Sequence, residues 1–207
     1  MRGLIVDFGG VLTTNVFDSF RAFGEQEGLD PDTVKRAFRE DPEALGLLRE
    51  LERGDIDVEE FEPRFGARIG VTNTAGLVER LFGGVGPDER MLEAVRRAGD
   101  AGICTGLISN SWGAGLTYDM SLLDELFEAV VISGDVGMHK PDPAIYMLGA
   151  ERLGLGTEEC VFVDDLRENC QGAEEVGMTA ILHRGADKTI PELERLFGLE
   201  LGASGKD

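Results

Sequence analysis

The residues of this sequence that are best suited to chemistry are carboxylates placed directly after short apolar segments. Asp7 follows the segment LIV at residues 4–6, and Asp164 and Asp165 follow VFV at residues 161–163. Three carboxylates gathered in one place would repel one another strongly unless a cation lay among them. A hard divalent ion held by one or two carboxylates, water and a substrate phosphate is typical of Mg²⁺. These residues therefore predict a Mg²⁺ site.

A hydroxyl, an amide and an ammonium group follow other apolar segments. Ser109 and Asn110 come directly after one such segment, and Lys140 lies in the loop after another. The Ser109 hydroxyl and nearby backbone N–H groups are suited to phosphate oxygens, and Lys140 would offset the charge of an incoming phosphoryl group. Asp7 would then be free to attack phosphorus and form an aspartyl phosphate. Each residue alone also fits a helix cap, a turn or a surface position, but their shared placement at strand ends favours a site.

The elements that must position these residues alternate between β-like and helical patterns. Five apolar runs read as strands, at residues 4–6, 103–109, 129–133, 160–163 and 179–183. Helical patterns separate them, among them PDERMLEAVRRAG at residues 87–99 and a helix capped by Asp142. This alternation predicts an α/β fold with a Rossmann-like, doubly wound parallel sheet. Ligands bind beyond the carboxyl ends of the strands in such sheets, which is where the polar residues fall.

Residues 15–86 interrupt the alternation. They hold five helical patterns and no convincing strand, at residues 17–23, 33–38, 44–51, 58–65 and 75–82. A structureless loop of that length would be improbable inside a domain, so the segment predicts an inserted helical cap. The α/β core would then comprise residues 1–14 and 87–200, and residues 201–207 would form a disordered tail.

The composition of the chain limits the classes of partner that it can bind. The 207 residues carry a formal net charge of −20, which disfavours nucleic acid or an anionic membrane and makes a local cation necessary for any anionic substrate. No apolar run approaches the roughly 20 residues that span a bilayer, and no signal peptide is visible. Cys104, Cys160 and Cys170 are odd in number and read as free thiols, so we expect a cytoplasmic protein. Monomer and homodimer both remain open.

Four motifs, in order along the chain, make this sequence resemble the haloacid dehalogenase-like hydrolases. They are VDFGGVL, LISNS, GMHKPDPAIY and VFVDDLREN, and they span nearly the whole chain. The segment SGDVGMHKPDPAIY and the tryptophan of SNSW resemble one branch in particular. That branch includes the N-terminal phosphatase domain of soluble epoxide hydrolase and bacterial sugar-1-phosphate phosphatases. The inserted helices resemble the family's cap of the first type.

The resemblance implies a role for each polar residue at the strand ends. Asp7 would be the nucleophile, Ser109 and Asn110 would position phosphate and nucleophile, and Lys140 would balance charge. For the metal, Asp165 matches the direct ligand of the fourth motif, and Asp7 would also bind it.

Two further acidic and amide side chains would complete the metal site by resemblance. Asp164 fits an outer-shell ligand, and Asn169, one helical turn after Asp165, would orient Asp165. The backbone carbonyl of Gly9 would bind the metal, and this glycine would let the chain turn tightly after the first strand.

Gly9 also departs from the family pattern. Many family phosphatases have an aspartate two residues after the nucleophile, which acts as general acid for the leaving group and then as base for water. The loss of such a group typically costs about 10²–10⁴-fold in rate. A leaving group that needs little protonation would remove the need for it, and Asn15, Asp18 and His139 are the nearby residues that could replace it.

The sequence favours a Mg²⁺-dependent phosphatase that acts on a small phosphorylated metabolite. Two alternatives stay open. A 2-haloacid dehalogenase needs neither metal nor general acid, but Asp164 and Asp165 would repel its carboxylate substrate. A phosphate-binding or regulatory protein with slow or no turnover would follow if nothing activates water for an aspartyl phosphate at Asp7.

Overall fold

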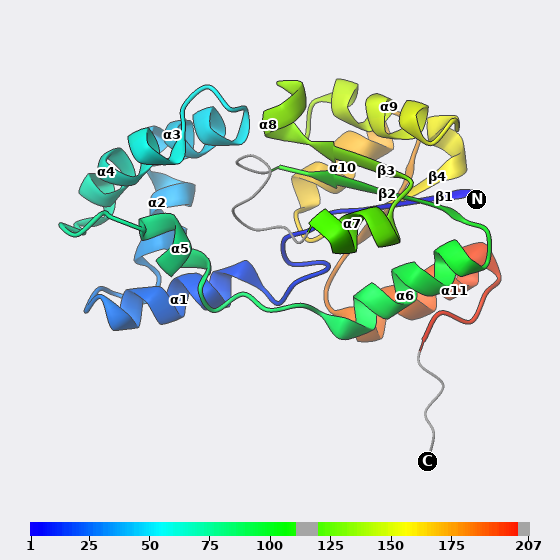
Figure 1. Cartoon of the computed structure of the whole chain (residues 1–207), viewed down its shortest axis with the longest axis horizontal. Helices are drawn as coiled ribbons and strands as arrows, with labels where there is room; N and C mark the ends of the chain where they lie inside the picture. Colours follow the sequence, from blue (N-terminus) through cyan, green and yellow to red (C-terminus); the bar gives the residue numbers. More distant parts are fainter. Residues whose placement is uncertain (111–119, 203–207) are drawn as a thin grey trace, which may run out of the picture.

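Five parallel strands form the centre of the larger part of the molecule in this computed structural model, which describes residues 1–110 and 120–202 (Figure 1). The strand order is β3-β2-β1-β4-β5, so the first strand lies in the middle of the sheet. All five predicted strands are present, which confirms the α/β sheet. Their bounds are Gly3–Val6 for β1, Cys104–Ser109 for β2, Ala129–Ile132 for β3, Cys160–Asp164 for β4 and Thr179–Leu182 for β5.

Helices cover both faces of the sheet, because alternate residues of each strand point to opposite sides. Leu4 and Val6 pack with α6 (Glu89–Asp100), α7 (Met120–Leu126) and α11 (Ala186–Phe197). Ile5 packs on the other side with α9 (Pro143–Arg152) and α10 (Arg167–Glu175). The short helices α8 (Ser133–Val136) and η1 (Thr157–Glu159) precede α9 and β4. The doubly wound architecture is therefore confirmed.

The predicted cap of α9 is present, and α6 has a cap that was not predicted. The Asp88 carboxylate accepts hydrogen bonds from the backbone N–H groups of Arg90 and Met91 at the start of α6. The Asp142 carboxylate accepts one from Ala144 N at the start of α9. Each cap satisfies donors that the helix itself cannot pair, so these acids determine where the helices begin.

A layer of five helices fills the chain between β1 and α6, at the left of Figure 1. Each coincides with one of the five predicted helical patterns. The helices are α1 (Val16–Gln26), α2 (Thr33–Glu40), α3 (Pro42–Glu52), α4 (Val58–Ile69) and α5 (Leu77–Phe82). We call them the cap helices. The exact division of the chain into core and cap at residues 15 and 86 stays a prediction.

Phenylalanine side chains build the interior of the cap helices. The ring of Phe65 stacks on Phe38 and on Phe61, with centroid separations of 4.7 and 5.0 Å. Phe20 contacts Phe82 edge-to-face at 5.4 Å. This cluster is separate from the two clusters that flank the sheet, so the cap helices have a hydrophobic core of their own.

The chain enters and leaves the cap helices at neighbouring points. Thr14 N donates to Gly86 O at 2.7 Å, and Gly86 N donates to Thr14 Oγ1 at 3.1 Å. Thr13 and Pro87 form an isolated antiparallel bridge beside them. A second connection lies at the far end of α3, where Ser133 Oγ donates to the backbone carbonyl of Glu52.

The expected tail is wrong for its first two residues. Leu201 is 1% exposed and belongs to the cluster that α6 and α11 form with the sheet. Its N–H and that of Gly202 both donate to Glu194 Oε1 at 2.9 Å, and Arg97 Nη1 donates to Gly202 O at 2.5 Å. Residues 203–207 lie outside the described part of the chain.

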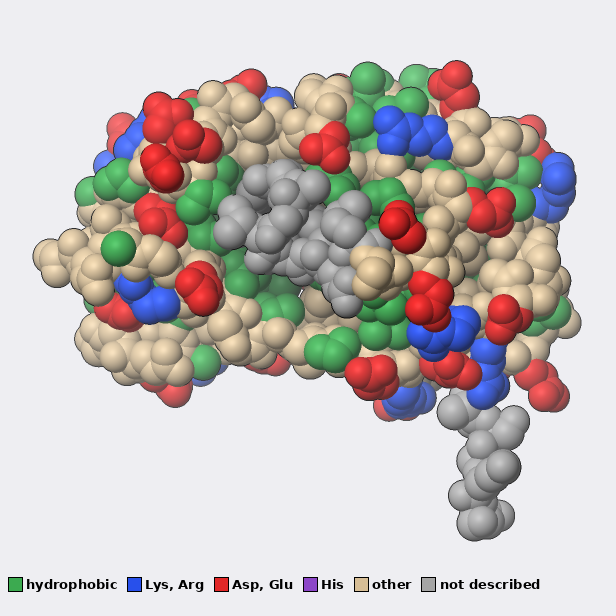
Figure 2. All heavy atoms as spheres, in the orientation of Figure 1, with side chains coloured by type: hydrophobic (Ala, Val, Ile, Leu, Met, Phe, Trp, Pro, Cys, Tyr) green, Lys and Arg blue, Asp and Glu red, His purple; other side chains and the backbone are tan. Residues whose placement is uncertain are grey.

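The described surface agrees with the composition. On the face shown in Figure 2, acidic side chains occur over both the cap helices and the α/β part, with Lys and Arg between them. All three cysteines are free thiols. Among the described residues, no helix is long and apolar enough to cross a membrane.

Candidate active site

The predicted site residues meet at the carboxyl edge of the three central strands. Asp7 comes one residue after β1, Ser109 is the last residue of β2 and Asp164 is the last residue of β4. Both neighbours pair directly with β1, with Val6 opposite Leu107 and Val163. Because the strand order reverses beside β1, this edge is where a doubly wound sheet opens to a ligand.

Lys140 holds the centre of this edge together. Its Nζ lies 2.7 Å from Asp7 Oδ1, 2.7 Å from Asp164 Oδ2 and 3.0 Å from the carbonyl oxygen of Ile108. The Lys140 side chain is fully buried, as is that of Asp164, whereas 12% of the Asp7 side chain is exposed. The Asp7 carboxylate therefore lies at the mouth of the site, where it is partly exposed to solvent. Its ion pair with the buried Lys140 fixes its position.

The Asp164 carboxylate is already surrounded by donors. Leu166 N donates to its Oδ1 at 2.8 Å, and the Asn169 amide donates to both oxygens at 3.1 Å. Together with Lys140, these donors fix its position. The sequence predicted that Asn169 orients Asp165. This expectation is wrong, because the Asn169 amide contacts Asp164.

Asn110 fixes the loop that carries Lys140. Its Oδ1 accepts from Lys140 N at 2.8 Å and its Nδ2 donates to Lys140 O at 3.0 Å. The amide thus positions the lysine, while direct contact of Asn110 with phosphate stays a prediction. Ser109 is buried at the end of β2, in place for its predicted role. Ser111 and the tryptophan after it lie outside the described residues.

Burial and mutual repulsion shape the charges of the site. Burial, partly offset by Lys140, raises the pKa of Asp7 to about 6. Burial, with the charges of Asp7 and Asp164, raises the pKa of Asp165 to about 7. Burial alone would lower the pKa of Lys140, but Asp164 and Asp7 outweigh it and raise this pKa above its usual value. One ammonium thus faces three carboxylates.

The carboxylates fit a divalent cation. Oxygens of Asp7, Asp164 and Asp165 lie within 4.8 Å of one another. Two of them have raised pKa values, so negative charge is held there at a cost that a cation would relieve. Oxygen donors of this kind suit Mg²⁺. Because Asp164 is occupied by other donors, Asp7 and Asp165 are the side chains that would hold the ion directly.

The two glycines after Asp7 differ in what they permit. Gly10 has a positive φ of 74°, and a Cβ there would lie 2.7 Å from Asp165 Oδ2. The tight turn and the close approach therefore both require Gly10. Gly9 has no positive φ, and a Cβ there would meet only the side chain of Val16, at 3.6 Å. Gly9 lies in the same turn, as expected, but its backbone does not require a glycine, and the chain has room for a side chain at this position.

Among the described residues, none of the three candidates to replace the missing acid has a side-chain hydrogen bond to Asp7 or Asp165, and their role stays a prediction. Asn15 caps α1 and accepts from Phe17 N at 2.9 Å. Asp18 is exposed in the first turn of the same helix. His139 Nδ1 lies 2.9 Å from the carbonyl oxygen of Lys140.

Sequence reasoning missed one titratable residue of the site. Glu52 ends α3, and burial raises its pKa to about 7, with Lys140 and Asp7 among the charges that act on it. The helical pattern of residues 44–51 contained no signal for this position, because periodicity does not reveal where a cap helix docks.

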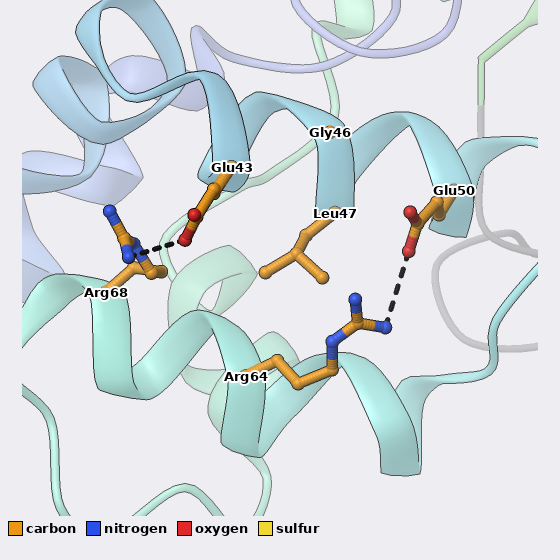
Figure 3. A pocket seen from close by; sticks show the side chains of 6 residues that line it. All are labelled: Glu43, Gly46, Leu47, Glu50, Arg64 and Arg68. Atoms are coloured by element: carbon orange, nitrogen blue, oxygen red, sulfur yellow. Dashed lines mark hydrogen bonds and ion pairs between the residues drawn. The ribbon is translucent and has the colours of Figure 1, made fainter.

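A groove on the outer face of the cap helices is unrelated to this site. Figure 3 shows Leu47 at its floor between α3 and α4, with exposed ion pairs at both ends. Arg64 pairs with Glu50 at 3.3 Å, and Arg68 with Glu43 at 2.6 Å. Exposed pairs of this kind fit a solvated surface.

Comparison with known proteins agrees with the geometry. Residues 1–177 match the family model of the haloacid dehalogenase-like hydrolases. The chain belongs to this family. The resemblance carried by the four motifs is therefore confirmed, and the chain is a hydrolase-family protein with the family's α/β fold.

Two of the curated relatives are much longer than the region that matches this chain. Mouse acyl-CoA dehydrogenase family member 10 is 27% identical over 97% of the chain, and pig bifunctional epoxide hydrolase 2 is 34% identical over 54%. The chain spans only 19% and 21% of their lengths. The sesquiterpene phosphatase astK of Aspergillus oryzae is 28% identical over 72% of the chain, and 78% of its own length is covered.

Solved structures share the fold over nearly the whole chain. A HAD family enzyme from Bacteroides thetaiotaomicron, solved with magnesium and inorganic phosphate, has a TM-score of 0.67 at 21% identity, with 93% of this chain and 98% of that one covered. A protein described as a dehalogenase has a TM-score of 0.72 at 18% identity, with 97% of each chain covered. These likenesses show the fold alone, so the reaction has to be argued from the site.

Proposed function

We propose that this protein is a Mg²⁺-dependent phosphatase that acts on a small phosphorylated metabolite through an aspartyl phosphate on Asp7. The observation that carries the proposal is the placement of Asp7. Its carboxylate lies at the mouth of the site, 2.7 Å from a buried lysine and within 4.8 Å of the Asp164 and Asp165 oxygens. The phosphatases among its relatives support the same reaction class.

The side chains divide the work of phosphoryl transfer. An Asp7 oxygen attacks phosphorus while the bond to the leaving oxygen breaks, and water later displaces phosphate from Asp7. Lys140 keeps the nucleophile oriented and offsets part of the negative charge that the phosphoryl group brings. Ser109 is the residue we expect to contact phosphate oxygens. Asp164 positions Lys140 through their 2.7 Å contact.

Asp7 and Asp165 are the side chains that would hold Mg²⁺, with the carbonyl of Gly9 as a further ligand. The ion, when bound, neutralises charge on the phosphoryl oxygens. The acidic surroundings need this, because among the described residues Lys140 pairs with only two of the three carboxylates, Asp7 and Asp164.

The same surroundings disfavour a dehalogenase. A 2-haloacid brings a carboxylate, which three acidic side chains and one lysine would repel without a metal. A phosphomonoester brought in with Mg²⁺ does not meet this barrier.

Phosphate release from a panel of phosphomonoesters, sugar-1-phosphates and acyl phosphates tests the proposal. We expect turnover with Mg²⁺, none with EDTA, and a loss on the order of 10⁴-fold or more in Asp7→Asn. Halide release from 2-haloacids by the same protein, without phosphate release, would indicate a dehalogenase. A stable phosphoryl adduct on Asp7 without turnover would indicate a slow, regulatory protein.

A further inference from the structure

The end of α3 rests on the carboxyl edge of the sheet. Ser133, the first residue of α8 directly after β3, donates its hydroxyl to the backbone carbonyl of Glu52. Two residues after Glu52, the two segments approach so closely that a Cβ on Gly54 would lie 3.1 Å from the carbonyl oxygen of Gly134. Figure 1 shows α3 reaching toward α8. This contact fixes Glu52 against the rim that carries the site.

Two of the four charges that act on the Glu52 side chain belong to that site. The four are Lys140 and Asp7 from the sheet edge, Arg49 from α3 itself, and Glu168 from the first turn of α10. Glu52 is half-buried, and among the described residues no donor to its carboxylate is found. The Glu52 carboxyl group is thus within reach of the charges at the sheet edge and, among the described residues, is not part of an ion pair.

The position is a poor one for a structural carboxylate. Glu52 occupies the last turn of α3, where the partial negative charge of the helix end opposes another negative charge. Its burial near Asp7 raises its pKa to about 7, so the neutral acid and the carboxylate are both accessible near neutral pH. Neither property adds stability to the fold, but both suit a group that gives and takes a proton.

We infer that Glu52 is the catalytic acid and base of this site, in place of the carboxylate missing at position 9. This inference rests on the proposed phosphatase function. In the first step Asp7 forms a bond to phosphorus, the bond to the leaving oxygen breaks, and the Glu52 carboxyl proton moves to that oxygen. In the second step the Glu52 carboxylate takes a proton from water as the water oxygen attacks phosphorus and the bond to Asp7 breaks. The enzyme is then restored, and inorganic phosphate leaves.

Glu52→Gln tests the first step through its dependence on the leaving group. We expect release of an alkyl leaving group, measured in a single turnover with enzyme in excess, to fall by about 10²–10⁴-fold. Release of p-nitrophenolate from p-nitrophenyl phosphate should change by less than about tenfold, since this leaving group needs little protonation. The phosphoryl adduct on Asp7 should then persist, because Gln cannot activate water.

Two variants separate this role from a structural one. Glu50→Gln makes the same change on the same helix, in a residue whose partner is Arg64 on the outer face, and should behave as wild type. Gly9→Asp in the Glu52→Gln background places a carboxyl where the backbone accepts a side chain, and should restore at least part of the alkyl phosphate activity.

The outcomes also separate this inference from the proposed function. Equal losses on alkyl and aryl phosphates, or no loss on either, would overturn the role of Glu52 while the phosphatase stands. Wild-type activity confined to aryl and acyl phosphates would overturn it as well, since no acid is then at work. If the wild-type protein shows no metal-dependent phosphate release, the proposed phosphatase function itself is wrong.

Discussion

The charges at the sheet edge and the charges on the outside of the cap helices are held in opposite ways. Lys140 and Asp164 are fully buried, each contacts several partners, and Lys140 depends on the carboxylates around it. Glu50 and Arg64 in the cap groove contact one another with side chains that are 38% and 51% exposed. Both kinds of ion pair have short separations, but the fold depends more on the buried pairs. Water can take the place of a lost partner only at the surface.

The largest expected effect is at the buried lysine. Lys140→Met leaves two carboxylates in the sheet edge without their partner, which should lower the free energy of unfolding by about 3–5 kcal/mol. Urea denaturation at neutral pH measures this. A loss below about 1 kcal/mol would mean that the buried network is no more important to the fold than a surface pair.

Glu52 lies where the two regions meet, and its stability effect should depend on pH. Burial raises the pKa of Glu52 to about 7; Asp7 and Glu168 act in the same direction, and Lys140 and Arg49 oppose it. The folded state therefore binds the Glu52 proton more tightly than the unfolded chain does. That contribution is present below about pH 4.5, the ordinary pKa, and is lost as pH rises through about 7. Glu52→Gln should therefore gain about 1–3 kcal/mol relative to wild type between pH 4.5 and 8. A difference that stays constant with pH would contradict this.

Alanine substitutions at Gly10 and Gly70 separate the effect of backbone strain from the effect of crowding at the site. Both have a positive φ, of 74° and 79°, but a Cβ on Gly70 meets nothing within 4 Å. Alanine at either position should cost about 1–2 kcal/mol of stability. Only Gly10→Ala should also displace Asp165 and weaken Mg²⁺ binding by about 10–100-fold, measured by titration calorimetry. Equal Mg²⁺ affinity in both variants would show that Asp165 does not hold the ion.

The smallest effect is expected in the cap groove. A double-mutant cycle on Glu50 and Arg64, with thermal unfolding as the readout, should give a coupling energy of at most about 1 kcal/mol that decreases with added salt. A coupling as large as the loss in Lys140→Met would remove the contrast between the two regions.

Much of this architecture was predictable from local pattern. The five strands, the five cap helices and the cap Asp142 each depend on residues that are close in sequence, so periodicity and capping chemistry revealed them. The meeting of Asp7, Ser109 and Asp164 followed from the rule that parallel strands bring their carboxyl ends to one edge. Helix α11 was missed, and its sequence carries a proline at position 191, inside the helix.

The finer details of the site depend on contacts across the chain. Asn169 turned out to contact Asp164 because the strand end and the first turn of α10 lie at a distance that sequence spacing does not define. The positive φ falls on Gly10 and not on Gly9, although both are glycines. Glu52 reaches the rim because α3 docks on α8, a choice made by the packing of whole helices.

The paired entry and exit of the cap helices has a consequence for how this protein could change over time. Thr14 and Gly86 are joined by two hydrogen bonds, so the two ends of the cap segment lie side by side. An insertion of some seventy residues therefore attaches to the core at a site no wider than a tight turn. A different segment whose ends meet there would leave the order of the strands unchanged. Replacing this one segment would therefore exchange the cap helices together with Glu52, the acid and base that we infer, while Asp7, Lys140 and Asp165 at the sheet edge are retained.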